Sequence, residues 1–146
     1  MSLKQTIMRF LRSWYLQESG KERISPNDWI RRDQIKYDPI TRTVSIGGLE
    51  PEVKVFGVAD TGSMDGLVDF GHSVILTDNF DKDKLAIGDI IAYYQISLNL
   101  TLHRIVEMGL DSQGKWYHTR GDNCIDNDGY RLRKEHIKYL LLGIIY

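Results

Sequence analysis

Apolar residues near the N-terminus recur every three or four positions, the spacing of one face of a helix. Basic residues occupy several of the polar positions between them, and Gly20 is placed to end the helix. The pattern predicts an amphipathic helix over residues 3–18. We expect its apolar stripe to pack on the domain; the alternative is a peripheral contact with an anionic membrane surface. The stripe consists of Leu3, Ile7, Phe10, Leu11, Trp14 and Tyr15.

A second, shorter helix is indicated a few residues later. Ser25 can cap its start, Pro26 suits the first helical position, and Asp28 can reach back to unpaired backbone N–H groups. This helix is expected to run to about Asp33. Together the two helices would form an N-terminal helical segment over residues 1–35.

From Thr41 onward the pattern changes from helical spacing to short runs of β type. Val44 and Ile46 alternate with polar residues, and a hairpin loop is expected over residues 109–114. A last apolar run is expected to form a buried closing strand, with a helical turn as the alternative. Residues 36–146 are therefore predicted to be one mainly β domain. Its further expected strands cover residues 53–58, 73–77, 89–95, 101–108, 115–119 and 139–146.

Length and charge narrow the class of protein. A chain of 146 residues buries enough surface to be stable as one domain without disulfides or a structural metal. Its 19 basic and 20 acidic residues give a net charge of −1, so nothing draws the whole chain to nucleic acid. We expect no nucleic-acid partner. The sequence carries no signal for an oligomeric state.

Metal and cofactor sites find little support in the sequence. Cys124 is the only cysteine, which excludes an internal disulfide and a multi-cysteine zinc site. Asp126, Asp128 and Glu135 fit part of a calcium-loop register, but that register puts Cys124 in the first ligand position and follows a predicted strand. No metal and no cofactor are therefore predicted.

Hydropathy predicts a chain that stays in the cytoplasm. The longest stretch without Asp, Glu, Lys or Arg, residues 90–103, is interrupted by Gln, Ser, Asn and Thr. Near the N-terminus, Lys4, Arg9 and Arg12 break any compact apolar run of the kind a secretory signal needs. We expect neither a membrane span nor a signal peptide.

Three segments carry residues suited to chemistry. Ser63 lies among glycines in a turn that follows a predicted strand, a suitable place for an exposed nucleophile and also an ordinary turn composition. His103 lies on a predicted strand; an imidazole titrates near neutral pH and can take the proton that a serine hydroxyl cannot lose unaided. The third segment, residues 119–128, has three carboxylates. Spacing alone does not show that these segments meet.

In order along the chain, these motifs resemble the type I signal peptidases. The motifs are Ser63-Met64, Gly88-Asp89-Ile90-Ile91-Ala92-Tyr93, His103-Arg104-Ile105-Val106 and Gly121-Asp122-Asn123 with Asp128. The resemblance covers about residues 55–146. It is strongest to the branch of the endoplasmic reticulum, archaea and some spore-forming bacteria, which uses histidine where common bacterial enzymes use lysine.

The resemblance implies a serine endopeptidase with the signal peptidase/LexA-like folded β-sheet. Ser63 would be the nucleophile and His103 the general base, with Asp122 and Asp128 as acidic residues; either of these could orient His103. The Thr61 hydroxyl and the Ser63 N–H would form the oxyanion hole.

The implied substrate is a polypeptide with small side chains just before the cut, paired as an extended strand with the backbone before Ser63. The substrate-binding residues would then be Ala59, Asp60, Gly62 and Met64.

The sequence also departs from the family. A polar, helix-containing segment stands where members carry a membrane-spanning helix, Gly66 replaces a common proline, and Gly71-His72 replaces Gly-Asp. Two alternatives therefore stay open. One is a self-cleaving protein like the LexA-type repressors, which use a lysine where His103 stands. The other is a binding or scaffold module that keeps the fold without the activity.

Overall fold

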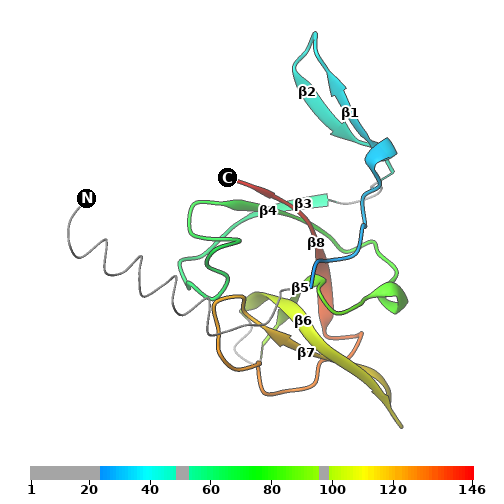
Figure 1. The fold of residues 1–146 in the computed structure, drawn as a ribbon, viewed down its shortest axis with the longest axis vertical. Helices are drawn as coiled ribbons and strands as arrows, with labels where there is room; N and C mark the ends of the chain where they lie inside the picture. Colours follow the sequence, from blue (N-terminus) through cyan, green and yellow to red (C-terminus); the bar gives the residue numbers. More distant parts are fainter. Residues whose placement is uncertain (1–23, 49–52, 96–98) are drawn as a thin grey trace, which may run out of the picture.

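A computed structural model of the chain describes residues 24–48, 53–95 and 99–146, and these form two antiparallel sheets. One sheet has two strands, β1–β2; the other has six, in the order β3-β4-β8-β5-β6-β7 (Figure 1). The protein is mainly β, as the sequence predicts. The strands are β1 (Ile35–Asp38), β2 (Thr43–Ile46), β3 (Val53–Gly57), β4 (Ser73–Thr77), β5 (Ile90–Tyr94), β6 (Leu100–Asp111), β7 (Gly114–Arg120) and β8 (Ile137–Ile145).

Most strands lie where the sequence predicts them, with three differences. The loop expected over residues 109–114 is shorter, because β6 continues to Asp111 and β7 begins at Gly114. The closing strand β8 lies inside the sheet, where it pairs with both β4 and β5. This position explains its continuous apolar sequence, because a strand inside a sheet with apolar contacts on both faces has no solvent side. The first strand of the chain, β1, was not predicted.

Only the second of the two predicted N-terminal helices lies within the described residues. The predicted helix over residues 3–18, with its possible membrane contact, lies outside the described residues. The short helix expected from Pro26 to Asp33 is wrong: residues 24–29 have no regular structure, and only a 3-10 turn, η1 (Arg32–Gln34), follows. Within the described ranges, no helix is long and apolar enough to cross a membrane.

A buried carboxylate explains why the short helix does not form. Asp89 is fully buried and accepts hydrogen bonds from the Asn27 backbone N–H, the Asn27 side-chain amide and the Trp29 indole. Trp29 also packs edge-on against Phe80, at 6.0 Å between ring centroids. These long-range contacts outweigh a capping signal whose worth is typically about 1 kcal/mol.

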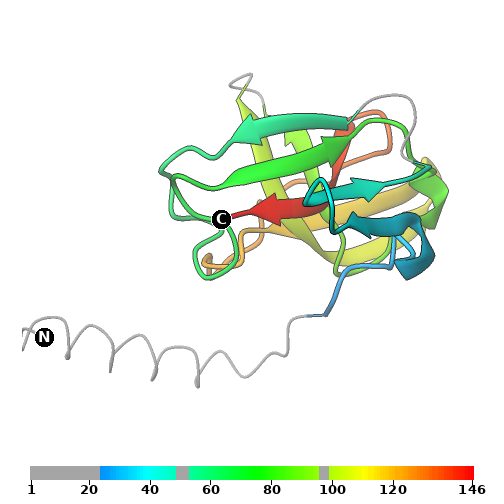
Figure 2. The ribbon, with the colours of Figure 1, turned by 90° about the horizontal axis from the view of Figure 1, so that it is seen from above.

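Apolar side chains pack on both faces of the central strands. On β5, Ile90 and Ala92 join one buried cluster while Ile91 and Tyr93 join the other. The first cluster also contains residues of β3, β4 and β6, because the sheet curls (Figure 2). The two clusters pack against the middle of the sheet from both faces, and this is the part of the fold that carries the polar groups described next.

Candidate active site

Ser63 lies in the loop between β3 and β4. Gly62, just before it, has a positive φ of 65°, a conformation that glycine adopts without the strain a side chain would bring. Just after it, the Val68 N–H donates to the Met64 carbonyl at 3.0 Å and closes a tight turn. Met64 itself is buried in the core. Ser63 is thereby held between a glycine turn and an anchored side chain.

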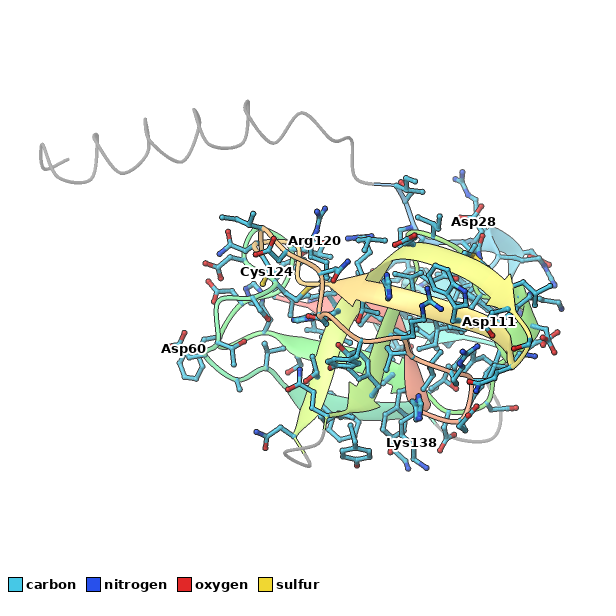
Figure 3. All side chains as sticks on the ribbon, turned by 90° about the horizontal axis from the view of Figure 1, so that it is seen from below. Asp28, Asp60, Asp111, Arg120, Cys124 and Lys138 are labelled. Atoms are coloured by element: carbon cyan, nitrogen blue, oxygen red, sulfur yellow. The ribbon has the colours of Figure 1, made fainter. Side chains whose placement is uncertain are left out.

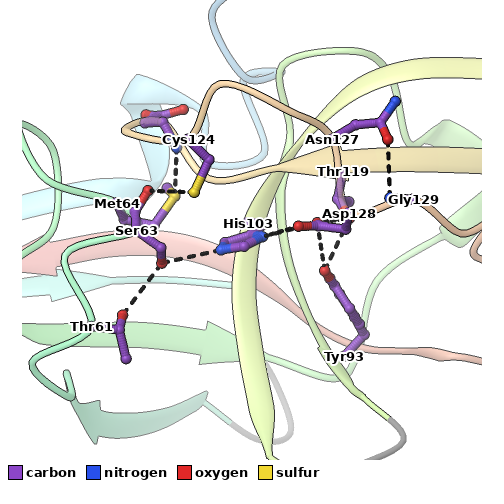
Figure 4. Close-up of polar contacts among 11 residues, drawn as sticks. Thr61, Ser63, Met64, Tyr93, His103, Thr119, Cys124, Asn127, Asp128 and Gly129 are labelled. Carbon is purple, nitrogen blue, oxygen red and sulfur yellow. Dashed lines mark hydrogen bonds and ion pairs between the residues drawn. The ribbon is translucent and has the colours of Figure 1, made fainter.

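His103 lies on β6 at the point where β7 leaves this strand. The last pair between the two strands is Arg104 with Arg120, so residues 100–103 of β6 have no partner in β7. Ser63 lies beside this edge, and its Oγ is 3.1 Å from His103 Nε2 (Figure 4). The structure thus joins a serine and a histidine separated by 40 residues.

Asp128 faces the other side of the imidazole. His103 Nδ1 lies 3.0 and 2.9 Å from the two Asp128 carboxylate oxygens. Both side chains are nearly buried, with exposed fractions of 8% for His103 and 12% for Asp128. Serine, histidine and aspartate therefore stand in line, each within hydrogen-bond distance of the next.

Two buried hydroxyl groups hold Asp128 as well. The Tyr93 hydroxyl donates to Asp128 Oδ2 at 2.8 Å, and the Thr119 hydroxyl donates to the same oxygen at 2.6 Å. Burial acts to raise the pKa of Asp128, but the hydrogen bonds from His103, Thr119 and Tyr93 hold this pKa below its ordinary value. Asp128 is thus a carboxylate ion at neutral pH.

Asp122, the other acidic residue that the resemblance singles out, has a different partner. Its carboxylate pairs with the Arg104 guanidinium through two contacts of 2.8 Å. A further Arg104 nitrogen donates to the Gly88 carbonyl at 2.8 Å. Of the two aspartates that the sequence left open, Asp128 contacts His103, and Asp122 forms a buried ion pair that anchors the next loop.

The loop that starts at Asp122 holds the serine turn in place. The Asn123 backbone N–H donates to the Ser63 carbonyl, and its side-chain amide donates to the Gly62 carbonyl, each at 2.9 Å. Gly121 passes so close that an added Cβ would overlap the Ser63 carbonyl oxygen. The Cys124 sulfur lies 3.9 Å from that same oxygen. Close packing therefore fixes the backbone around Ser63.

Donors for a developing negative charge are present beside Ser63. Within the part of the chain that the structure describes, the Ser63 backbone N–H has no hydrogen-bond partner. The Thr61 hydroxyl lies 3.3 Å from Ser63 Oγ. These are the two groups that the resemblance assigns to an oxyanion hole.

A small pocket of about 90 Å³ adjoins Ser63. It lies between the serine loop and the end of β6 that does not pair with β7, and Val68 closes part of its wall. Of the four residues that the resemblance assigns to substrate contact, Ala59, Gly62 and Met64 line this pocket and Asp60 does not. Asp60 is exposed at the outer tip of its loop (Figure 3). The remaining lining residues are Val58, Thr61, Ser63, Asp69, Leu100 and Leu102.

The backbone before Ser63 differs from a regular strand. The Thr61 N–H bonds to the Ala59 carbonyl at 2.9 Å, and the Gly62 carbonyl already accepts from Asn123. An extended partner could therefore pair with only part of residues 59–62.

In residues 24–48, 53–95 and 99–146, no three His, Cys, Asp or Glu side chains gather closely enough to hold a metal ion.

Three residues of the site were missed by sequence reasoning. Tyr93 ends the Gly88–Tyr93 motif and Thr119 begins the segment with three carboxylates, but nothing in either pattern marks the role of the hydroxyl. Asn123 stands in the Gly-Asp-Asn motif, which marked the segment but not the role of its amide. All three depend on contacts between segments distant in sequence.

No protein-family profile, curated protein or solved structure matches this chain. Ser63, His103 and Asp128 place a hydroxyl beside an imidazole and the imidazole beside a carboxylate, an arrangement in which a serine can be activated as a nucleophile.

Proposed function

We propose that the chain is a serine endopeptidase of the signal peptidase-like type. The observation that carries the proposal is the line from Ser63 Oγ to His103 Nε2, at 3.1 Å, and from His103 Nδ1 to Asp128, at 2.9 Å. A serine hydroxyl is a weak nucleophile until a base takes its proton, and this arrangement supplies the base. We also propose that the β sheets of this chain form the signal peptidase/LexA-like fold.

The reaction would be acyl transfer in two stages. Ser63 Oγ attacks a peptide carbonyl while its proton passes to His103 Nε2, and the imidazolium then protonates the leaving amine. Water next attacks the acyl-enzyme, again with His103 as base, and releases Ser63. Asp128 stabilises the imidazolium in both stages without taking the proton.

The oxyanion of each tetrahedral intermediate would be stabilised by the Ser63 N–H and the Thr61 hydroxyl. Removing one oxyanion-hole donor typically costs a hundredfold to a thousandfold in kcat, on the order of 3 kcal/mol. The lack of a partner for the Ser63 N–H among the described residues supports this role.

The small pocket supports a preference for small side chains just before the cut. At about 90 Å³ it suits alanine-sized or serine-sized side chains rather than large aromatic ones. The substrate would be a polypeptide held beside residues 59–62 and the unpaired edge of β6.

The decisive experiment is cleavage of a peptide library by the purified protein from pH 5 to 9. The variants are Ser63→Ala and His103→Ala, and Ser112→Ala is the matched control because Ser112 lies exposed in the β6–β7 turn. We expect activity to rise with pH as imidazole becomes neutral. Both site variants should lose it by a factor on the order of 10⁴ to 10⁶, whereas the control keeps it.

Other outcomes identify the alternatives. A serine-directed fluorophosphonate that labels the wild type and not Ser63→Ala, as measured by intact mass, would support an activated serine without any knowledge of the substrate. Two fragments after long incubation would indicate self-cleavage. If the protein cleaves no peptide and is not labelled, the proposal is overturned in favour of a binding module.

A further inference from the structure

Three neighbouring strands contribute to the surroundings of Asp128. Tyr93 comes from β5, His103 from β6 and Thr119 from β7, and these strands are adjacent in the sheet. The side chains of Tyr93 and Thr119 are completely buried. Figure 4 shows the Tyr93 hydroxyl directed at the carboxylate, and the Thr119 hydroxyl also donates to it. Hydroxyls that point inward from two strands are costly unless they are hydrogen-bonded, and here both have the same partner.

The number of protons on each group determines which groups around Asp128 donate hydrogen bonds and which accept them. A carboxylate ion only accepts hydrogen bonds, and each hydroxyl has one proton to donate. Tyr93 lies 2.8 Å and Thr119 2.6 Å from Asp128 Oδ2, and the two hydroxyl oxygens lie 3.0 Å from each other. Because a carboxylate ion supplies no proton, each of the two short contacts to Asp128 uses the proton of the hydroxyl itself. The third neighbour, His103 Nδ1, must then also be a donor. An imidazole with its proton on Nδ1 has an unprotonated Nε2 that can accept from Ser63.

We propose that Tyr93 and Thr119 are positioning residues whose hydroxyls fix the Asp128 carboxylate, so that His103 carries its proton on Nδ1 and presents an unprotonated Nε2 to Ser63. The catalytic consequence rests on the proposed function. The tautomer and the state of Asp128 are properties of the protein without substrate, and they can be measured separately.

The charges around Asp128 agree with this arrangement. Burial raises the pKa of the Tyr93 phenol far above its ordinary value, so this hydroxyl keeps its proton at every relevant pH. The titratable groups in contact with Asp128 are His103 and Tyr93; Tyr130 lies behind Tyr93, with 6.2 Å between ring centroids. No second carboxylate lies among these contacts.

The test uses Tyr93→Phe, Thr119→Val and the double variant, which remove the hydroxyls and keep the shape of the side chains. Tyr94→Phe is the matched control, because Tyr94 is the next residue of β5 and is 52% exposed. The ¹⁵N NMR signals of His103 report its tautomer, and the ¹³C signal of the Asp128 carboxyl reports its titration. kcat and KM are measured on a peptide selected from the library.

We expect the wild type to show protonated Nδ1 and the double variant to show a mixture of tautomers. Each single variant should raise the pKa of Asp128 by about one pH unit, since one hydrogen bond to a charged group is lost. The same loss should lower kcat about tenfold with KM nearly unchanged. Tyr94→Phe should leave all three readouts as in the wild type.

A protonated Nε2 in the wild type would overturn the inference. So would an unchanged Asp128 titration in a double variant that is still folded, as judged by its urea midpoint and its near-UV circular dichroism. If the wild type cleaves no peptide, the proposed function fails, while the tautomer and the titration still decide the inference. A general loss of stability would change the urea midpoint without moving the titration, which separates a merely structural role from positioning.

Discussion

The β1–β2 hairpin and the central strands β5, β6 and β7 are both antiparallel, yet their side chains occupy opposite environments. Ile40, in the hairpin turn, is 91% exposed, whereas Ile91 of β5 is fully buried. Conversely, the centre buries the polar groups of His103 and Thr119. Figure 1 shows the hairpin standing apart from the six-stranded sheet. The contrast shows that hydrogen bonding and packing, rather than residue polarity alone, decide what this fold buries.

The two regions are also held together at different sequence distances. Ile35 pairs with Ile46 across the hairpin, and Asp38 Oδ1 accepts from the Ile40 N–H at 2.8 Å within the turn. Such local contacts make a two-stranded unit that is marginal alone. In the centre, His103 bonds to groups 40 and 25 residues away. The same substitution made in the hairpin and in the central strands should therefore change stability or activity by different amounts.

The largest difference is expected for the substitution Ile→Ala. Ile91→Ala empties space in the packed core and should lower the free energy of unfolding by about 2–5 kcal/mol. Ile40→Ala removes an exposed side chain and should change it by less than about 0.5 kcal/mol. Urea denaturation of both variants measures the difference. Similar losses in the two would mean that the hairpin turn is packed in solution.

A smaller effect is expected from adding one methyl group to a glycine. Gly121→Ala would push on the Ser63 carbonyl, and we expect kcat/KM to fall about a hundredfold, or about 2.7 kcal/mol, because nucleophile and base move apart. Gly47→Ala is the hairpin counterpart, with its nearest atom, the Gln34 carbonyl oxygen, 3.9 Å from the added Cβ. It should leave kcat/KM unchanged. Equal activities of the two variants would contradict close packing around Ser63.

The smallest expected effect is a change of the free energy of unfolding with pH. We compare it at Asp128 and Asp38. Both carboxyls have a pKa below the ordinary 3.8: in Asp128 the hydrogen bonds outweigh burial, and in Asp38 the Thr41 side chain and neighbouring N–H groups act. When the pKa of a carboxyl is lower in the folded than in the unfolded state, the group adds stability above the unfolded pKa. This stability is lost as pH falls from the unfolded pKa through the folded pKa. The advantage of wild type over Asp128→Asn should therefore shrink between pH 5 and 3.

Asp38→Asn serves as the control for this measurement, because Asp38 is exposed and an Asn oxygen can accept the same hydrogen bonds. Its difference from wild type should vary less over the same pH range in urea denaturation. A larger pH dependence for Asp38→Asn than for Asp128→Asn would refute the assignment of Asp128 as a buried, hydrogen-bonded carboxylate.

Sequence patterns predicted the strands of the sheet better than the short helix after Ser25. Buried Val74 and Leu76 alternate with Ser73 and Ile75, which are partly exposed, and the expected strand over residues 73–77 is confirmed without change. The helix expected after Ser25 failed because Asp89 binds Asn27 and Trp29 from 60 or more residues away. Such a partner leaves no local trace in the sequence.

What the sequence determined by itself is the β class, most strand positions and the set of polar residues available for chemistry, because alternation and turn residues act over a few positions. Only the tertiary structure decided that β8 lies inside the sheet and that Asp128, rather than Asp122, contacts His103. The physical reason is that a carboxylate in a folded chain takes the donors that packing brings near it. Asp122 meets the Arg104 guanidinium, whereas Asp128 meets an imidazole and two buried hydroxyls.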